Sequence, residues 1–211
     1  MKKLCLALGL LALLPLAACA QDDTYVEGVH YDPVSPALRA RDSEKIEVLE
    51  FFWYGCGHCY NFEPLVTRWK KTLPDDVDFV LSPAMWNGPM GLHAQAFYTA
   101  RALDVMKSLH GALFAAMNVD KKRLGSEEEI GQIFQANGVD AEAFSRTFRS
   151  FGVTSQVKQA DARARSARIT GTPEMVVAGK YRVGTRKAGS QADMLKIVDF
   201  LIEKERAAAG Q

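Results

Sequence analysis

The feature that most constrains the fold is a short apolar run that ends just before a pair of cysteines. Residues 45–53 (KIEVLEFFW) are typical of a β-strand buried on both faces of a sheet that is covered by helices. From Cys59 onward the pattern changes to helical spacing, and Pro64 predicts a kink in that helix. The apolar positions of the helix are Phe62, Leu65, Val66 and Trp69. The motif CGHC, residues 56–59, is therefore expected at a strand-to-helix turn.

The remaining patterns indicate an α/β protein that carries a helical insertion. Residues 77–81 predict a second strand, which completes a β-α-β unit. No strand pattern occurs over residues 92–158, and a capping box at residues 126–129 opens one of the helices expected there. Strand patterns return at residues 175–177 and 181–183 as a hairpin. A final helix is expected to begin at Ser190.

The N-terminus has the pattern of a secretory signal peptide over residues 1–20. Lys2 and Lys3 form a positive region, residues 4–16 are apolar, and small residues follow. The end of the segment fits two patterns. Leu-Ala-Ala-Cys resembles a bacterial lipobox, in which Cys19 is lipidated and anchors the mature protein. Ala-Cys-Ala also fits a plain cleavage site that releases the protein from Gln21.

Removal of the signal leaves two cysteines, Cys56 and Cys59, out of the four in the chain. A disulfide between them closes a minimal loop and stabilises a fold little, so the pair favours a chemical role. Zinc is the alternative use of such a motif, but a structural zinc site needs four ligands. No second cysteine pair follows, and the other histidines are scattered at His30, His93 and His110. We therefore expect no metal.

The charge and composition of the chain argue against several other classes of protein. The chain of 211 residues is 48% hydrophobic and 24% charged, which is typical of a globular protein rather than a disordered one. The net charge of +1 indicates neither nucleic acid nor an anionic membrane surface as a partner.

The two cysteines are expected to differ in reactivity. Cys56 stands where a helix begins, and free amides and the helix dipole at that end lower the pKa of a thiol. His58 stands between the cysteines and is positioned to stabilise the thiolate further, although it is also consistent with a bystander on an exposed turn. Cys56 is then the exposed nucleophile and Cys59 the buried resolving thiol of an exchange through a mixed disulfide.

Glu50 and Thr172–Pro173 are further candidates. A carboxylate within the apolar strand is costly unless it is paired or functional. Glu50 is expected either to relay a proton for Cys59 with a raised pKa or to lie at a sheet margin open to solvent. Thr172–Pro173 precedes the hairpin, where the dipeptide alone favours an ordinary trans proline that opens a strand.

The segment VLEFFWYGCGHC, residues 48–59, resembles the active-site segment of the DsbA family of thiol:disulfide interchange proteins, within the thioredoxin superfamily. The proline five residues after Cys59 and the sequence Gly171-Thr172-Pro173 resemble that family too. The resemblance covers residues 25 to 207. It implies a thioredoxin-like fold with an inserted all-helical domain, divided into residues 21–91, 92–158 and 159–211.

The resemblance also implies an activity without any cofactor. A periplasmic oxidase of this family passes its disulfide to reduced, unfolded exported proteins and is reoxidised by a DsbB-like membrane quinone reductase. The residues carried over are Cys56, His58, Cys59, Glu50 and Pro173. The bond before Pro173 is then cis, and it exposes the Thr172 backbone to a substrate strand.

Two differences from the sequence pattern of the DsbA family leave a second activity possible. Many DsbA proteins have proline where this chain has Gly57, and Gly-His is also the dipeptide of protein disulfide isomerases. Thr172 replaces the valine of some DsbA proteins. An isomerase or reductase of the same fold is therefore the alternative, and a metal-binding protein the remote one. Because only about 25 mature residues precede the first strand, we expect a monomer rather than an isomerase with a dimerisation domain.

Overall fold

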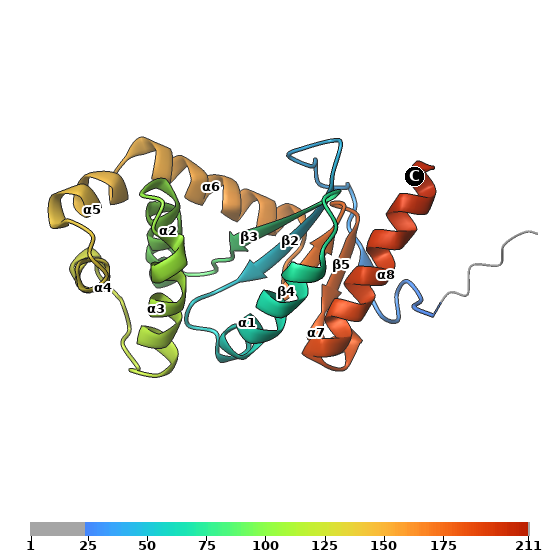
Figure 1. Ribbon diagram of the computed structural model, residues 1–211, viewed down its shortest axis with the longest axis horizontal. Coiled ribbons are helices and arrows are strands. Elements are labelled where there is room, and N and C mark those ends of the chain that lie inside the picture. The colour runs from blue at the N-terminus through green and yellow to red at the C-terminus, as the bar shows by residue number, and fades with distance from the viewer. Residues whose placement is uncertain (1–23, 211) are drawn as a thin grey trace, which may run out of the picture.

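The computed structural model describes residues 24–210, which form a five-stranded mixed sheet flanked by helices (Figure 1). The sheet order is β1-β5-β4-β2-β3. The strands are β1 (Asp32–Pro33), β2 (Ile46–Phe52), β3 (Val77–Pro83), β4 (Glu174–Val177) and β5 (Tyr181–Gly184). The expectations that Cys19 is lipidated and that residues 1–20 form a signal peptide lie outside the described residues.

Strand β2 is central, as its apolar sequence predicts. It pairs parallel with β3 and antiparallel with β4, and six of its seven residues are buried. Because side chains alternate along a strand, the two faces of β2 contribute to different parts of the core. Val48 packs with helices α1 (Gly57–Trp69) and α8 (Gln191–Ala209). Leu49 and Phe51 pack with the end of helix α6 (Phe151–Ser166).

The predicted hairpin joins β4 and β5 through residues 178–180. The Lys180 amide donates to the Val177 carbonyl at 2.9 Å, and the two central residues of this turn, Ala178 and Gly179, have positive φ of 50° and 68°, as a type I′ turn requires. A side chain at Gly179 would also meet the Leu38 carbonyl oxygen at 2.3 Å, so only glycine fits. Strand β1 pairs antiparallel with the free edge of β5.

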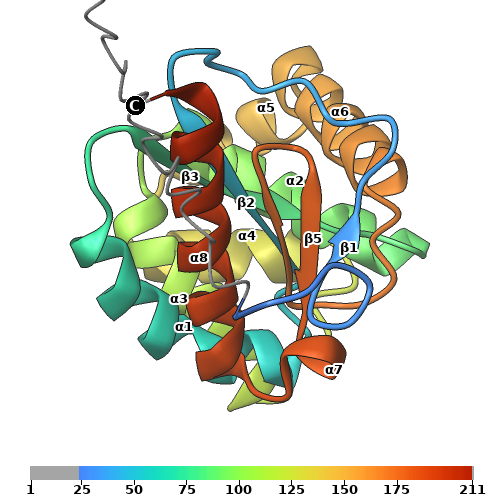
Figure 2. The same ribbon diagram turned by 90° about the vertical axis from the view of Figure 1, so that its right-hand side faces the viewer.

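The insertion consists of helices and their connections (Figures 1 and 2). Its apolar side chains form a second core together with Phe52, Tyr54 and Cys59. Its other helices are α2 (Gly88–Ala102), α3 (Met106–Asn118), α4 (Glu127–Ala136) and α5 (Ala141–Phe148). Half of the predicted capping box is present, since the Ser126 side chain accepts from the Glu129 amide. The Glu129 carboxylate accepts from the amide of Gly125, one residue before the cap, rather than from that of Ser126. Helix α6 runs without interruption across residues 158 and 159, so the division of the chain at that point stays a prediction.

Several boundaries differ from the sequence patterns. Strand β3 extends to Pro83, two residues beyond the predicted end. Helix α6 ends at Ser166, just before Arg168 takes a left-handed φ of 53°. A short helix α7 (Thr185–Ala188), which no pattern indicated, links β5 to α8. Helix α8 begins after its cap Ser190, as predicted. Within residues 24–210, no helix is both long and apolar enough to cross a membrane.

Candidate active site

Cys56 caps the N-terminus of α1, directly beyond the end of β2. Its backbone is extended, with φ −88° and ψ 110°, and its amide donates to the Trp53 carbonyl at 3.0 Å. The Cys56 Sγ accepts the Cys59 amide hydrogen at 3.3 Å. This is the geometry of an N-cap, with sulfur in place of the usual side-chain oxygen, and it places an anion where the helix favours one.

The Cys56 sulfur is only partly exposed, contrary to the expectation of an exposed nucleophile. Hydrogen bonding from the Cys59 thiol lowers the pKa of Cys56 to about 5, helped by the amides of residues 58 and 59 and opposed by desolvation. In its thiol form the group donates to the Thr172 carbonyl oxygen at 3.2 Å. The structure therefore brings Cys56 and the residue before Pro173 into contact across 116 residues of sequence. The Thr172–Pro173 bond is cis, as the family resemblance implies.

Cys59 lies one turn into α1 and has no exposed surface. Burial raises its pKa far above that of an ordinary thiol, and the neighbouring Cys56 sulfur raises it further. The two sulfur atoms of the motif are thus electrostatically unequal, with an ionised outer group and a protonated inner one at neutral pH.

Glu50 is fully buried, so the alternative of an acid at a solvated sheet margin is wrong. It lies opposite Leu81 of β3 and Met175 of β4, and neither carboxyl oxygen has a hydrogen-bond partner among the described residues. Desolvation and the charge of Glu63 raise its pKa well above the ordinary value, while Lys70 opposes the shift. The nearby cation thus comes from the segment after α1, whereas β3 supplies none.

The His58 side chain is exposed, and its ring forms no hydrogen bond with any described residue. Its backbone carbonyl accepts from the Gln191 side chain at 2.6 Å, which ties the start of α1 to the start of α8. The structure therefore holds the His58 backbone in place and leaves the ring free to face a bound partner.

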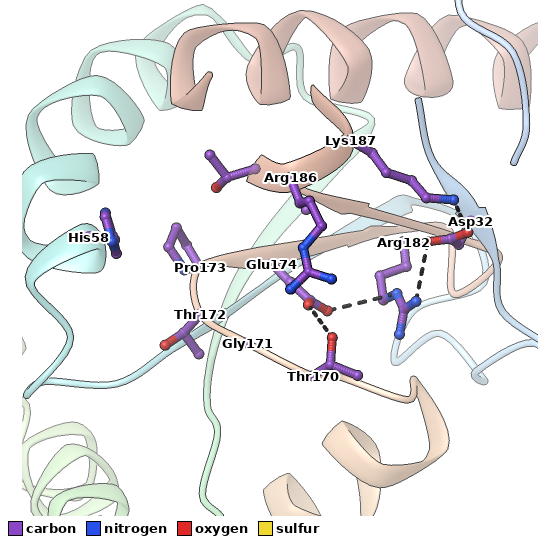
Figure 3. Close-up of a pocket in the computed structure, with 12 residues that line it drawn as sticks. Asp32, His58, Thr170, Gly171, Thr172, Pro173, Glu174, Arg182, Arg186 and Lys187 are labelled. Carbon is purple, nitrogen blue, oxygen red and sulfur yellow. Dashed lines mark hydrogen bonds and ion pairs between the residues drawn. The ribbon is translucent and has the colours of Figure 1, made fainter. Parts of the chain in front are cut away.

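A cleft of about 290 Å³ opens beside the cis-proline loop (Figure 3). Residues 170–174 form one wall, Arg182 and residues 184–187 of β5 and α7 form the other, and His58 lies at one end. The cleft thus begins next to Cys56 and leads away from it along polar side chains.

Sequence reasoning missed a buried histidine that supports the active-site turn. His93 of α2 is 3% exposed and accepts from the Trp53 indole N–H at 2.8 Å through Nδ1. Its Nε2 lies 3.1 Å from the Leu124 carbonyl oxygen, which only accepts, so His93 is the neutral Nε2–H tautomer. The Trp53 ring in turn covers Gly55, where an added Cβ would lie 2.3 Å from the indole.

A second unpredicted group lies between α1 and α3. The Tyr54 hydroxyl lies 2.9 Å from Nδ1 of His110, whose Nε2 is 3.3 Å from a Glu63 oxygen. The Asn118 side chain donates to the Tyr54 carbonyl at 2.8 Å. No sequence pattern linked these residues, because Tyr54 precedes α1, Glu63 lies within α1, and His110 and Asn118 lie on α3. The contacts between them span up to 64 residues.

No group of three or more metal-ligating side chains occurs within the described part of the chain. Over residues 92–196 the sequence matches the family described as DSBA-like thioredoxin domain. It is 42% identical over 204 residues to the thiol:disulfide interchange protein DsbA of Pseudomonas aeruginosa, covering 95% of this chain and 97% of that protein. It is 39% identical over 210 residues to the DsbA of Pseudomonas syringae pv. tomato, covering 99% and 98%.

The fold agrees with the sequence comparison. The crystal structure of Pseudomonas aeruginosa DsbA superposes with a TM-score of 0.86 over 90% of this chain and 99% of that one. That similarity confirms the thioredoxin-like fold with a helical insertion. The chain belongs to the DsbA family of thiol:disulfide interchange proteins and is a protein thiol–disulfide oxidoreductase.

Proposed function

We propose that this protein is a periplasmic oxidase that donates a Cys56–Cys59 disulfide to exported proteins as they fold. The observation that carries the proposal is the unequal setting of the two thiols: Cys56 caps α1 and accepts the Cys59 amide hydrogen at 3.3 Å, whereas Cys59 is fully buried. This setting lowers the pKa of Cys56 to about 5 and raises that of Cys59. A stabilised Cys56 thiolate favours the reduced enzyme, and an enzyme that is stable when reduced is a strong oxidant.

The reaction proceeds in two exchanges. A substrate thiolate attacks the Cys56 sulfur of the oxidised enzyme, and the enzyme disulfide breaks with its electron pair on Cys59, which takes up a proton. A second substrate thiolate then attacks the substrate sulfur of this mixed disulfide, and Cys56 leaves as a thiolate. The substrate loses two electrons to the enzyme pair. The low pKa of Cys56 makes it a good leaving group in the second step.

The other site residues have supporting roles in this proposal. Glu50 accepts and returns the proton of buried Cys59, because it is an unpaired carboxyl group inside the sheet. The His58 ring interacts with the Cys56 thiolate or with the bound substrate. The Thr172 backbone beside Pro173 pairs with an extended substrate segment, since its carbonyl lies 3.2 Å from the Cys56 sulfur.

The compartment and partners follow from the family and from the N-terminal pattern. Export to the periplasm is supported by the signal-like residues 1–20. Reoxidation needs an acceptor for two electrons, which we assign to a DsbB-like membrane quinone reductase. The protein acts as a monomer, and it is lipid-anchored if Cys19 becomes the mature N-terminus. The mass of the mature N-terminus distinguishes a lipidated Cys19 from a free Gln21.

Substitution of Cys59 tests the exchange. A Cys59→Ala enzyme lacks the resolving thiol and should accumulate mixed disulfides with exported proteins through Cys56. The matched Cys56→Ala enzyme should accumulate none. Equal adducts in both variants, or none in either, would contradict the roles assigned to the two cysteines. The isomerase alternative, raised by Gly57, instead requires that the reduced wild-type enzyme reshuffle a scrambled disulfide protein.

A further inference from the structure

The cleft beside the cis-proline loop carries a positive charge that its own carboxylates leave unpaired. Lys187 and Arg182 contact Asp32 at 2.5 Å and 3.2 Å, and Arg182 lies 3.8 Å from Glu174. Three cations thus face two carboxylates across this cleft. Arg186 is the remaining cation, and it forms no ion pair or hydrogen bond with any residue in the described range 24–210.

The position of Arg186 places this charge on the path of a bound substrate. It is exposed on α7, and Figure 3 shows its side chain pointing from α7 into the cleft. The opposite wall contains Thr172, whose carbonyl contacts the Cys56 sulfur. Arg186 and Thr172 line the same cleft, so a segment that pairs at Thr172 passes Arg186 close in sequence to its own cysteine, since an extended peptide advances only about 3.3 Å per residue.

We propose that Arg186 selects exported segments that carry an aspartate or glutamate within about three residues of the reacting cysteine. The planar guanidinium matches a carboxylate through two parallel hydrogen bonds, and the neighbouring cations are already engaged by Asp32 and Glu174. The inference rests on the proposed donation of the disulfide to exported proteins. For an exposed ion pair, we expect a preference of about two- to five-fold in the rate of oxidation.

A peptide series tests the proposal. Reduced two-cysteine peptides of one sequence carry aspartate, alanine or lysine at each of the three positions on either side of the first cysteine. Their oxidation by the oxidised full-length protein is measured as a second-order rate constant at low salt. The enzymes are wild type, Arg186→Gln and Arg186→Glu, with Arg68→Gln as a matched control. Arg68 is also exposed but lies near the far end of α1.

The proposal predicts that wild type and Arg68→Gln oxidise an aspartate peptide about two- to five-fold faster than its lysine partner at one or more positions. Arg186→Gln should abolish that ratio, Arg186→Glu should invert it, and added salt should weaken it. Equal ratios in wild type and Arg186→Glu would overturn the proposal. The alanine peptides separate the two claims: if wild type oxidises them efficiently while the ratio is flat, only the role of Arg186 fails. If it does not oxidise them, the oxidase function fails as well.

Discussion

Protonation of Cys56 should change the number of protons that accompany reduction of the Cys56–Cys59 disulfide. With the pKa of Cys56 at about 5 and that of Cys59 raised, the reduced pair at pH 7 holds one thiolate and one thiol. Reduction then takes up two electrons and one proton, and the potential falls by about 30 mV per pH unit. Below pH 5 both sulfur atoms are protonated on reduction, and the fall of the potential doubles to about 59 mV per pH unit.

The size of the effect follows from the same shift. A thiol with the ordinary pKa of 9.0 is about 1% ionised at pH 7, whereas one with a pKa of about 5 is about 99% ionised. At pH 7 the difference stabilises the reduced form by at most about 2.7 kcal/mol. Solvent screening at this partly exposed sulfur lowers that figure to about 2 kcal/mol, or about 40 mV in favour of the reduced form. Because folding lowers this pKa, the stabilisation is complete above pH 9 and is lost as the pH falls through 5.

Two measurements check this reasoning together. The potential is measured in glutathione buffers on both sides of pH 5, and the thiolate of the reduced protein is titrated by its ultraviolet absorbance. The absorbance should change with a midpoint near pH 5, at the pH where the slope of the potential changes. The Cys56→Ser variant should lack the absorbance change. A slope of about 59 mV that continues through pH 7, or a thiolate midpoint above pH 8, would refute the assignment.

Three substitutions test other parts of the site. Glu50→Leu removes a buried carboxyl group without hydrogen bonds, so it should raise the free energy of unfolding by about 1–3 kcal/mol in urea denaturation while slowing release of the mixed disulfide. His93→Phe leaves the Trp53 indole N–H without its acceptor and should destabilise the protein by about 1–3 kcal/mol, with a shift in tryptophan fluorescence. Gly55→Ala forces a Cβ against the Trp53 ring and should cost about 1–3 kcal/mol, whereas Gly111→Ala, with open space around it, should not destabilise the fold.

Each of these substitutions has an outcome that contradicts its premise. If Glu50→Leu lowers stability, the carboxyl group has a partner or a protonation state other than that inferred. If it releases mixed disulfides at the wild-type rate, Glu50 does not handle the Cys59 proton. Wild-type stability in His93→Phe would mean that Trp53 is held by packing alone. Equal losses at the two glycine positions would show that helix propensity and backbone effects, rather than contact with the indole, dominate.

Local sequence patterns predicted the main strands and helices and the position of the cysteine motif between them. The run at residues 45–53 became the central strand, because continuous apolar sequence is compatible with burial on both faces. The hairpin and the cap at Ser190 followed from turn and capping chemistry, which act over a few residues. The motif at residues 56–59 lies at the expected strand-to-helix turn, and Cys59 is buried as expected.

The residues that surround and hold the active site are brought together by long-range contacts, which no local sequence pattern predicts. Trp53 and His93 are 40 residues apart, and nothing in either segment indicates that they meet. The positive charge that opposes the raised pKa of Glu50 comes from Lys70 after α1, and no pattern in β2 or β3 indicates that Lys70 lies near Glu50. The availability of Arg186 depends on Asp32 and Glu174 being occupied by other cations, which only the assembled sheet brings about.

The most direct test of the oxidase assignment is the reduction potential of the Cys56–Cys59 pair at pH 7, measured at equilibrium with glutathione. A stabilised Cys56 thiolate predicts a potential well above the value of about −270 mV that is typical of the reducing thioredoxins. A measured potential at or below about −270 mV would mean that the pair withdraws disulfides from its partners, and it would contradict the proposed oxidase.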